Sequence, residues 1–453
     1  MTDTKFTVAI CGAGVAGLTL AVALSKHPDI QIDLYEAADS LFEAGVGIGL
    51  WPRSWKIVEK FGLQRPLSSV ALIPPESLPQ ISLNFRKSDE ALGLNVNQLI
   101  TPGMLTFHRP DFQRVLVDQL QSTTCHIHRS RRLVSYTNPQ PGSEASRPPI
   151  QLRFDDGSSS TCDLLIGADG LHSTVRACMF QEIASKACAE GRSDDARQAL
   201  QSIEPRWSGI CMYRATYPAE LLSRCYKRHR ALREPTVYVG TNTQITVYPI
   251  SRGTQISVTA TLANFDLEDT PFDGPLMEDV PQDVILHEFD RWEPEVQALF
   301  QCADTASRWA VHTCPPLDTY VSDRVALIGD AAHAMLPHEG VGPGQAIEDA
   351  YLLATLLGNS KTTISTLPKI LEIYDTIRRP FAQQAMNRSR ENAMLYTLTF
   401  PGLTFDRPED YDDTQKRRLS EVCYRIRKNW EWVWTTTIDE DIDRAVDMLE
   451  RQG

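Results

Sequence analysis

The chain has 453 residues, of which 42% are hydrophobic and 23% charged, as in an ordinary globular protein of two or three domains. Its 45 basic and 58 acidic residues give a formal net charge of −13, which argues against nucleic acid or an anionic membrane as a partner, because both require a basic surface. No apolar run reaches the roughly 18 residues that a membrane span needs, so we expect none.

The first strong motif is the segment FTVAICGAGVAGLTLAVALSKH at 6–27. Its apolar start predicts a buried parallel strand, and Gly12, Gly14 and Gly17 then fit the pattern G-x-G-x-x-G ahead of a helix. In such a motif the first glycine permits a tight turn, the second lets the backbone approach a pyrophosphate, and the third lets the helix pack on the strand. A second strand ends in Glu36, which can accept hydrogen bonds from a ribose. We therefore predict a site for FAD or NAD.

The next segments favour FAD, because they do not continue as the single doubly wound domain of an NAD dehydrogenase. A second glycine-rich loop, which includes Gly49, runs into a helix within 44–63, and residues 106–120 predict a short loop followed by an amphipathic helix. Residues 150–176 predict a β-hairpin with an Asp-Gly turn, whose second strand ends in GADG at 167–170. Alternating β-branched residues at 234–262 predict an antiparallel sheet.

The segment GDAAHAMLPHEGVGPGQAIEDA at 329–350 follows a predicted buried strand, so Asp330 lies at a strand end, where ligands bind in doubly wound folds. A helix is predicted after residue 342. His333, His338 and Glu339 suggest a metal site at first sight. Their spacing does not match H-x-x-x-H on a helix, and loop ligands would require cysteine or a third histidine. We predict no metal site, and we expect His333 to order the turn.

The ordered motifs resemble those of the class A flavin-dependent aromatic hydroxylases, especially the salicylate-hydroxylase-like branch. The resemblance rests on GAGVAG at 12–17, GADGLHSTVR at 167–176 and ALIGDAAHAMLPHEGVGPGQAIEDA at 326–350. The segments FHRPDF at 107–112 and NWEWVW at 429–434 are also similar to those of the family.

The resemblance implies an α/β fold with a discontinuous Rossmann-like FAD-binding domain, an antiparallel-sheet substrate domain and a C-terminal helical segment. The corresponding boundaries are 1–75, 100–183 and 300–360 for the FAD-binding domain, 76–99 and 205–299 for the substrate domain, and 361–453 for the helical segment.

The resemblance also implies the chemistry: a monooxygenase with tightly bound FAD, reduced transiently by NADPH or NADH, that reacts with O2 to give a flavin C4a-hydroperoxide and hydroxylates an aromatic substrate. Arg109 is expected near the ribityl–phosphate region, Asp330 on the ribityl chain, and the N-terminus of the helix after residue 342 at the flavin ring. The full set of expected cofactor-binding residues is Gly12, Gly14, Ala16, Gly17, Glu36, Gly49, Arg109, Asp169, Asp330, Gly342 and Gly344. For Asp169 a purely structural role is equally compatible with the sequence.

Three residues are candidates for the substrate side. Arg214 and Tyr248 fall on predicted strands and resemble positions that hold a phenolate or carboxylate in related enzymes, and Pro337 resembles a proline beside the flavin. An arginine there favours the phenolate by charge pairing, which makes the ring a better nucleophile. The segment departs from a common family form at Glu339, where glutamine is frequent, which leaves open whether Glu339 acts on the flavin or only faces solvent.

The sequence thus predicts a cytoplasmic FAD-dependent monooxygenase, monomeric or homodimeric, that acts on a phenolic or carboxylated aromatic. The cytoplasm is expected because the ten cysteines form no CxxC pair and no secretory leader precedes the first strand. Hydroxylation, oxidative decarboxylation and dearomatisation remain alternatives, as do a flavin reductase or dehydrogenase without oxygenation and a non-catalytic flavin redox sensor.

Overall fold

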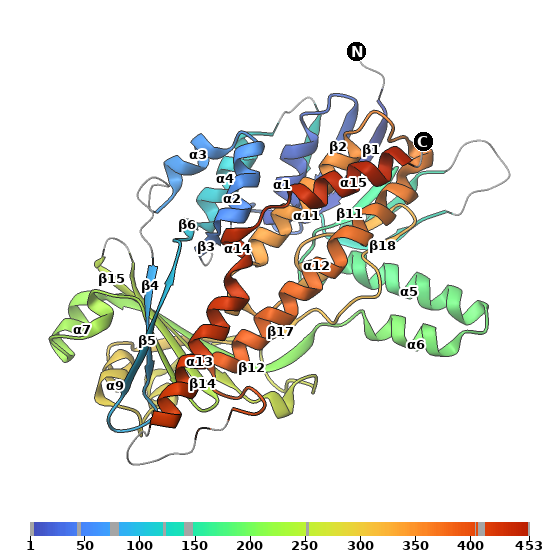
Figure 1. The fold of residues 1–453 in the computed structure, drawn as a ribbon. Helices are drawn as coiled ribbons and strands as arrows, with labels where there is room; N and C mark the ends of the chain where they lie inside the picture. The colour runs from blue at the N-terminus through green and yellow to red at the C-terminus, as the bar shows by residue number, and fades with distance from the viewer. Residues whose placement is uncertain are drawn as a thin grey trace.

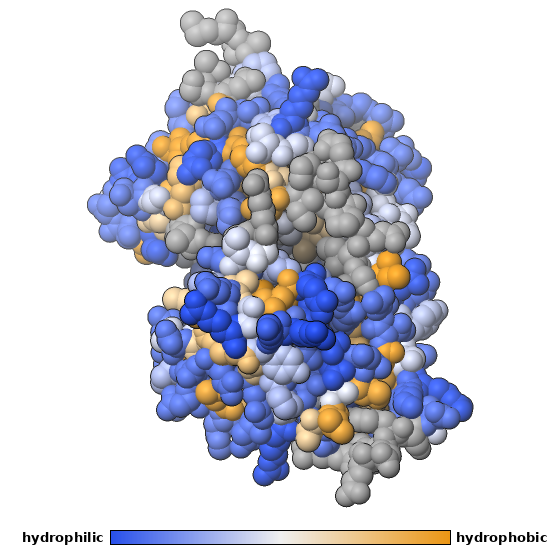
Figure 2. Space-filling view, turned by 90° about the vertical axis from the view of Figure 1, so that its left-hand side faces the viewer, coloured by the Kyte–Doolittle hydropathy of each residue, from blue (hydrophilic) through white to orange (hydrophobic). Residues whose placement is uncertain are grey.

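The computed structural model describes residues 4–42, 47–72, 81–120, 124–139, 148–250, 253–403, 405 and 413–451. Parts of two predicted segments, 44–46 in the second glycine-rich loop and 76–80 at the start of the substrate domain, lie outside the described residues. The molecule has two lobes joined at a narrower waist (Figures 1 and 2). Each lobe is built around its own sheet.

The first lobe contains a six-stranded sheet in the order β18-β19-β11-β1-β2-β7, in which every neighbouring pair is parallel except β18 with β19. The predicted strand–turn–helix–strand unit is confirmed at its centre, where helix α1 (Val15–Leu24) connects β1 to β2. Nine of the ten α1 residues, all except Val15, are buried, because α1 packs between the sheet and α11 (Gly342–Leu357). The strands are β1 (Phe6–Cys11), β2 (Ile30–Tyr35), β7 (Cys125–His128), β11 (Leu164–Gly167), β18 (Val321–Ser322) and β19 (Val325–Leu327).

The second lobe contains an eight-stranded sheet in the order β16-β17-β12-β15-β14-β13-β4-β5. The predicted antiparallel sheet is confirmed, although β4 and β13 pair in parallel. One face forms an apolar core under three helices, α7 (Ala219–Cys225), α8 (Gln282–Glu288) and α9 (Pro294–Gln301). The strands are β4 (Ile81–Lys87), β5 (Leu94–Thr101), β12 (Arg206–Pro218), β13 (Thr236–Gly240), β14 (Thr243–Ile250), β15 (Gln255–Ala263), β16 (Met277–Pro281) and β17 (Thr305–Thr313).

Two small antiparallel sheets complete the first lobe: β3 (Gly47–Leu50) with β6 (Leu105–His108), and β8 (Leu133–Thr137), β9 (Ile150–Phe154) and β10 (Ser159–Cys162). The predicted Asp-Gly turn joins β9 to β10, with Gly157 at φ +82°. The prediction that one strand continues to residue 167 is wrong. The chain turns at Asp163, whose carboxylate accepts from the backbone and hydroxyl of Thr7, and then enters the parallel sheet as β11.

The C-terminal helical segment is confirmed, and it joins the two lobes. Helix α12 (Leu367–Tyr396) is long enough to run from the first lobe to the second, and α13 (Asp413–Trp430) lies beside it (Figure 1). Residues of α13 pack on β4, β5 and β13, while α15 (Asp439–Arg451) returns to α11 and α12. The chain therefore closes by packing on both sheets.

The remaining helices are α2 (Pro52–Lys60), α3 (Gln64–Val70), α4 (Arg109–Asp118), α5 (Thr174–Ala189), α6 (Ser193–Gln201), α10 (Asp330–His333) and α14 (Trp432–Thr435), with short 3-10 turns at Arg230–Leu232, Phe265–Leu267, Pro337–Glu339 and Ile364–Thr366. Among the described residues, no helix combines the length and the apolar character needed to cross a membrane.

The predicted domain boundaries stay predictions. The eight-stranded sheet includes β5 up to residue 101 and β17 at 305–313, so it extends past the expected limits at 99 and 299.

Candidate active site

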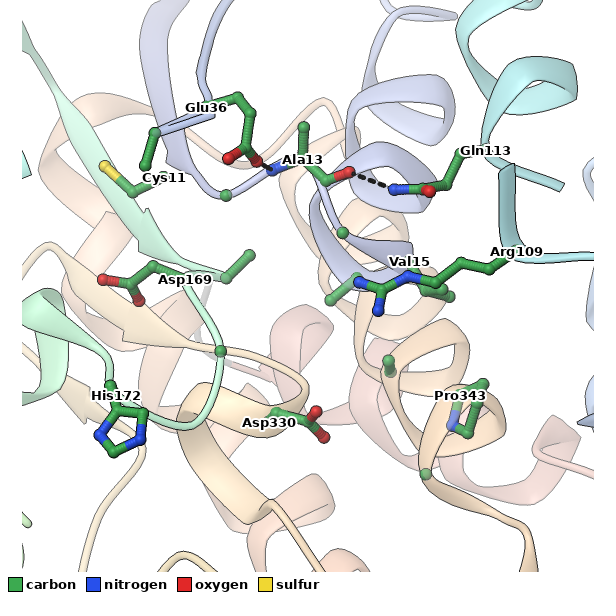
Figure 3. A pocket seen from close by; sticks show the side chains of 18 of the residues that line it. Cys11, Ala13, Val15, Glu36, Arg109, Gln113, Asp169, His172, Asp330 and Pro343 are labelled. Carbon is green, nitrogen blue, oxygen red and sulfur yellow. Dashed lines mark hydrogen bonds between the residues drawn. The ribbon is translucent and has the colours of Figure 1, made fainter. Parts of the chain in front are cut away.

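A cavity of about 520 Å³ opens at the carboxyl ends of β1, β2 and β11, within the size range of small-molecule and cofactor sites. Its walls come from the first glycine turn, the end of β2, the start of α4, the turn after β11 and the segment from Met335 to Ala346 (Figure 3). These are the segments in which the sequence places the cofactor motifs. The carboxyl edge of a parallel sheet brings them together although they are far apart in the chain.

The first glycine turn has the geometry that its spacing predicts. Gly12 adopts φ +104°, and a Cβ there would lie 2.3 Å from the carbonyl oxygen of Ala168. A Cβ on Gly17 would lie 1.9 Å from the carbonyl oxygen of Gly12, so only glycine allows the helix to approach the turn. At Gly14 a Cβ would meet no described atom within 4 Å, because the position borders the open cavity. Close backbone approach by a ligand is therefore possible at Gly14.

Two helix N-termini border the same cavity. Helix α1 follows Gly14 and α11 begins at Gly342, and neither has a side-chain cap among the described residues. A Cβ on Gly342 would also meet no described atom within 4 Å. Free N–H groups and the positive end of the helix dipole attract anions. The two ends suit a pyrophosphate at α1 and the electron-rich edge of a reduced flavin at α11, so the cavity fits FAD.

Glu36 lies at the end of β2 beside this turn. Its two carboxylate oxygens accept from the backbone N–H groups of Ala13 and Ala38, each at 2.8 Å. On the other side of the turn, the side-chain amide of Gln113 donates to the carbonyl of Ala13 at 3.1 Å (Figure 3). Glu36 thus lines the cavity and also braces the turn, and it retains lone pairs that a ribose hydroxyl can use.

Arg109 and Asp330 project into the cavity from different walls (Figure 3). Arg109 is the first residue of α4, and Asp330 is the first residue of α10, after the end of β19. Asp169 also lines the cavity, but its carboxylate accepts from the hydroxyl of Ser173 and from the backbone N–H of Val175. Burial raises the pKa of Asp169, and these hydrogen bonds oppose the rise. Asp169 therefore caps the start of α5 in this structure.

Three of the expected cofactor-binding residues have packing roles. Ala16 lines the cavity, and a Cβ on Gly329 would lie 2.8 Å from its methyl group. Gly49 does not line the cavity; a Cβ there would lie 2.2 Å from the sulfur of Met104. Gly344 is in the first turn of α11, where a Cβ would lie 2.3 Å from the hydroxyl oxygen of Ser54.

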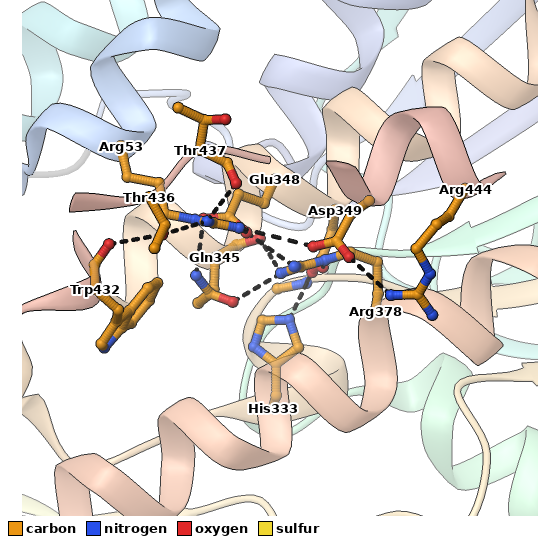
Figure 4. Close-up of polar contacts among 12 residues, drawn as sticks. Arg53, His333, Gln345, Glu348, Asp349, Arg378, Trp432, Thr436, Thr437 and Arg444 are labelled. Carbon is orange, nitrogen blue, oxygen red and sulfur yellow. Dashed lines mark hydrogen bonds and ion pairs between the residues drawn. The ribbon is translucent and has the colours of Figure 1, made fainter. Parts of the chain in front are cut away.

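His333 orders the segment after β19, as expected. Its Nε2 lies 2.5 Å from Oδ2 of Asp349, which also accepts from the backbone N–H of Gly329 at 2.9 Å. Asp349 is in turn held by Arg378 of α12 at 2.8 Å (Figure 4). Burial alone would raise the pKa of Asp349, but His333 and Arg378 hold it below its ordinary value. The turn that carries Asp330 is thereby tied to α11 and α12.

This network continues along α11 through Glu348. Its carboxylate accepts from Arg378 at 2.9 Å and from Arg53 of α2 at 2.8 Å, and all three side chains are buried. Arg53 also donates to the hydroxyl of Thr436 at 2.7 Å and to the carbonyl of Thr437 at 2.6 Å (Figure 4). The C-terminal segment is thus connected to the helix that borders the cavity.

His338 and Glu339 follow Pro337 in the loop that lines the cavity, but they are directed into the interior. His338 is 6% exposed and Glu339 is 1% exposed, and in the described part of the chain neither side chain has a hydrogen-bond partner. Burial lowers the pKa of His338 to about 4 and raises that of Glu339 to about 8, with Arg388 opposing the latter. The expectation that Glu339 faces solvent, one of the two considered, is wrong, because the C-terminal helices cover it.

Arg214 and Tyr248 lie on the face of the eight-stranded sheet that is turned toward the first lobe. Arg214 of β12 pairs with Thr259 of β15, which in turn pairs with Thr246 of β14. Tyr248 is two residues further along β14. The side chains of Arg214 and Tyr248 therefore lie on the same face of the sheet. On this face Met212 packs with Leu336, which lines the cavity beside Pro337. The three predicted substrate-side residues thus belong to the surfaces that meet between the lobes.

Arg214 has an unusual environment for an arginine. Its Nε is buried and has no hydrogen-bond partner among the described residues, and its guanidinium lies 5.6 Å from the ring centroid of Trp309. Desolvation lowers the pKa of Arg214, and Tyr248 opposes this shift. A buried donor without a partner is costly, and an anionic ligand would satisfy it.

Sequence reasoning missed several residues of the site. Gln113 and His172 line the cavity. Arg378 of α12 donates to Glu348 and Asp349 of α11 and so fixes the helix whose start borders the cavity. Glu348 and Asp349 lie at the end of the third motif, on the helix predicted after residue 342, so two adjacent acids among its apolar residues were a usable signal. In the described ranges, no cluster of three or more histidine, cysteine or acidic side chains is arranged to bind a metal.

Comparison with known proteins identifies the family. The family model described as the FAD binding domain matches residues 5–207 and 293–389. A salicylate hydroxylase from Pseudomonas putida is 33% identical over 97% of this chain and 93% of its own length. An FAD-dependent monooxygenase from Strobilurus tenacellus is 31% identical over 99% of both chains. The solved structure of a salicylate hydroxylase substrate complex matches with a TM-score of 0.80 and 29% identity over 98% of both chains. As its motifs predicted, the chain belongs to the class A FAD-dependent aromatic hydroxylases and is an FAD-dependent monooxygenase.

Proposed function

We propose that the protein hydroxylates an aromatic ring that carries a hydroxyl and a carboxylate group, as salicylate does, using NADH or NADPH and O2. The observation that carries this proposal is the buried Nε of Arg214, which has no hydrogen-bond partner among the described residues and lies on the face between the lobes. The chain is similar over nearly its whole length to proteins named salicylate hydroxylases, and this similarity supports the same substrate class.

The role of Arg214 follows from its charge and surroundings. Because water does not reach its Nε, a carboxylate or phenolate bound there forms a charge-assisted hydrogen bond in a medium of low dielectric constant. Pairing with the guanidinium favours the ionised phenol, which makes the ring more electron-rich. Tyr248, on the same face, can orient the ligand through its hydroxyl. Pro337 would form part of the opposite wall.

We propose that FAD binds along the cavity, with its pyrophosphate at Gly14 and the start of α1, its ribose at Glu36, and its ribityl chain between Arg109 and Asp330. The start of α11 at Gly342 would face the flavin ring. When bound, FAD supplies the electron transfer between nicotinamide and oxygen. The protein holds the cofactor, excludes water and orients the ring of the substrate. A cytoplasmic, monomeric or homodimeric enzyme remains our expectation.

The proposal is tested with purified, FAD-loaded protein and a panel of phenols, benzoates and hydroxybenzoates. We expect ortho-hydroxybenzoates to stimulate NADH or NADPH oxidation most strongly and to yield an oxygenated product. Measuring released CO2 in the same reactions separates hydroxylation with decarboxylation from hydroxylation alone. Hydrogen peroxide without oxygenated product for every compound would contradict the proposal and favour a flavin oxidoreductase that does not oxygenate.

Substitution of Arg214 tests the substrate site. Arg214→Ala should lower kcat/KM for the best hydroxybenzoate by about 10- to 100-fold, since a charge-assisted hydrogen bond contributes about 1.5–3 kcal/mol. FAD content should not change. The matched control is Arg308→Ala: Arg308 lies on β17 opposite Tyr213, on the other face of the same sheet, where it pairs with Glu278. Equal losses in both variants would remove Arg214 from the substrate site.

Substitution of Asp330 tests the cofactor site. Asp330→Ala should weaken FAD binding by about 10- to 100-fold, because it removes a hydrogen bond from a charged acceptor. The dissociation constant is measured by titrating apoprotein with FAD and following flavin fluorescence. Asp195→Ala, an exposed position on α6, serves as the control. An unchanged dissociation constant in Asp330→Ala would refute the assigned contact.

A further inference from the structure

Two tryptophans from distant parts of the chain hold the loop that precedes α11. The indole N–H of Trp51, the residue before α2, donates to the carbonyl of Glu339 at 3.0 Å. The indole N–H of Trp430, the last residue of α13, donates to the carbonyl of His338 at 3.3 Å. Both hydrogen bonds are buried, and they span 288 and 92 positions of the sequence. Two successive peptide groups of the loop are therefore fixed from outside it.

The other two carbonyls of this loop are also hydrogen-bonded. Ser389 of α12 donates its hydroxyl to the carbonyl of Leu336, and the N–H of Gly340 donates to the carbonyl of Pro337 at 3.1 Å. Leu336, Pro337 and Gly340 line the cavity, whereas neither indole is among its lining residues. The carbonyls that the two indoles hold are therefore directed into the interior of the protein.

The two tryptophans pack as one unit, which we call the indole clamp. The ring centroids of Trp51 and Trp430 lie 5.7 Å apart, and Trp51 also packs in one apolar cluster with Val341, directly before α11. A buried indole N–H requires an acceptor, so the rings keep the orientation in which the loop carbonyls satisfy them. The clamp thus fixes the direction of the peptide groups where the loop enters α11.

Without the clamp, the peptide between Glu339 and Gly340 has room to rotate. Gly340 adopts φ +63°, and glycine tolerates either sign of φ. Rotation would give up the hydrogen bond from Gly340 to Pro337, and it would turn the oxygen of Glu339 toward the cavity that Gly340 lines. The hydrogen bond from Trp51 opposes this rotation.

We propose that the indole clamp turns the loop carbonyls away from the flavin ring and thereby favours reduced FAD, a role that rests on the proposed placement of the ring at the start of α11. A carbonyl oxygen is the negative end of its dipole, so beside the ring it would oppose added electrons, and screening inside a protein is weak. With the carbonyls turned away, the positive end of α11 at Gly342 faces the ring. Trp51 and Trp430 are positioning residues, because they act through the loop.

Trp51→Phe tests the clamp, because phenylalanine keeps a buried ring but has no N–H group. The midpoint potential of bound FAD, measured anaerobically against a reference dye, should fall. The affinity for reduced relative to oxidised FAD should drop by about 3- to 10-fold, which is about 14–30 mV for a two-electron couple. Trp430→Phe should lower the potential by a smaller amount, since its hydrogen bond is longer. The dissociation constant of oxidised FAD from the protein should change by less than about threefold.

Two other buried tryptophans provide matched controls. Trp55 of α2 is 8% exposed, against 6% for Trp51, and it stacks on Phe107. Trp292, in the core of the second lobe, is 7% exposed, as is Trp430. Trp55→Phe and Trp292→Phe should lower the melting temperature as the clamp variants do, because each leaves a smaller ring in a packed core. Both should keep the potential of the wild type.

Three outcomes would overturn the proposal: an unchanged potential in both clamp variants, a rise in either, or an equal fall in Trp55→Phe. If Trp51→Phe does not retain FAD, the potential of Trp430→Phe decides. The potentials are measured without an aromatic substrate, so they do not depend on which ring the enzyme hydroxylates. A wild type that binds FAD but oxygenates no hydroxybenzoate would contradict the proposed function and leave the role of the clamp intact.

Discussion

Arg378→Ala should lower the free energy of unfolding by about 3–5 kcal/mol, the cost expected when one partner of a buried charge cluster is removed. Arg378 is fully buried and donates to Asp349 at 2.8 Å, to Glu348 at 2.9 Å and to the side-chain oxygen of Gln345 at 2.7 Å. Without it, the two carboxylates remain in the interior with less compensating charge. Urea unfolding of the FAD-loaded protein, followed by tryptophan fluorescence, measures the change.

The adjacent arginine provides a matched control. Arg379 pairs with Asp375 four residues earlier on α12, and its side chain is 28% exposed. Arg379→Ala should cost only about 0–1 kcal/mol, as for other partly solvated pairs. Similar losses in the two variants would mean that the cluster formed by Arg378, Glu348 and Asp349 contributes no more than a surface ion pair.

Glu339→Gln should raise the free energy of unfolding by about 3 kcal/mol at pH 7 and by less than about 1 kcal/mol at pH 5. Burial raises the pKa of the Glu339 carboxyl from an ordinary value of 4.5 to about 8 in the folded protein. Between these values the folded state holds a proton that the unfolded state releases. The stability of the wild type therefore falls as the pH rises through this window, by about 1.4 kcal/mol per unit. Glutamine is neutral throughout and removes that slope.

The measurement is urea unfolding of both proteins at a series of pH values between about 5 and 8, with the difference between them plotted against pH. Glu431→Gln is the control, because hydrogen bonding to Lys428 lowers the pKa of Glu431 and the group is already ionised across the window. A difference between Glu339→Gln and the wild type that does not change with pH would show that Glu339 is ionised in the folded protein.

The cofactor turn could be predicted almost completely from the sequence. Gly12 and Gly17 act within one strand–turn–helix–strand unit, so their roles depend on local geometry, and the structure gives them the backbone and close contacts that the spacing indicates. Glu36 lies at the predicted end of the second strand, and its contact with a ribose stays a prediction. For Arg214 and Tyr248, two of the substrate-site candidates, the sequence predicted only that each lies on a strand. The shared face of Arg214 and Tyr248 depends on the pairing of β12, β15 and β14.

Other roles could not be predicted, because they depend on segments distant in the chain. Asp169 belongs to a cofactor motif, yet in the structure it caps α5. Gly49 belongs to a glycine-rich loop, yet it makes room for Met104. His333 was expected to order its turn, but its partner Asp349 depends on how α11 packs behind it.

The family, the FAD chemistry and the parallel-sheet site could be read from the sequence, since motifs for nucleotide binding are short-range constraints on backbone shape. Which polar groups are buried without partners depends on the tertiary structure. Arg214 is desolvated because two lobes meet over it, and Glu339 because the C-terminal helices cover it. The desolvation of a group depends on all the atoms packed around it, and most of these atoms belong to residues that are distant in the sequence.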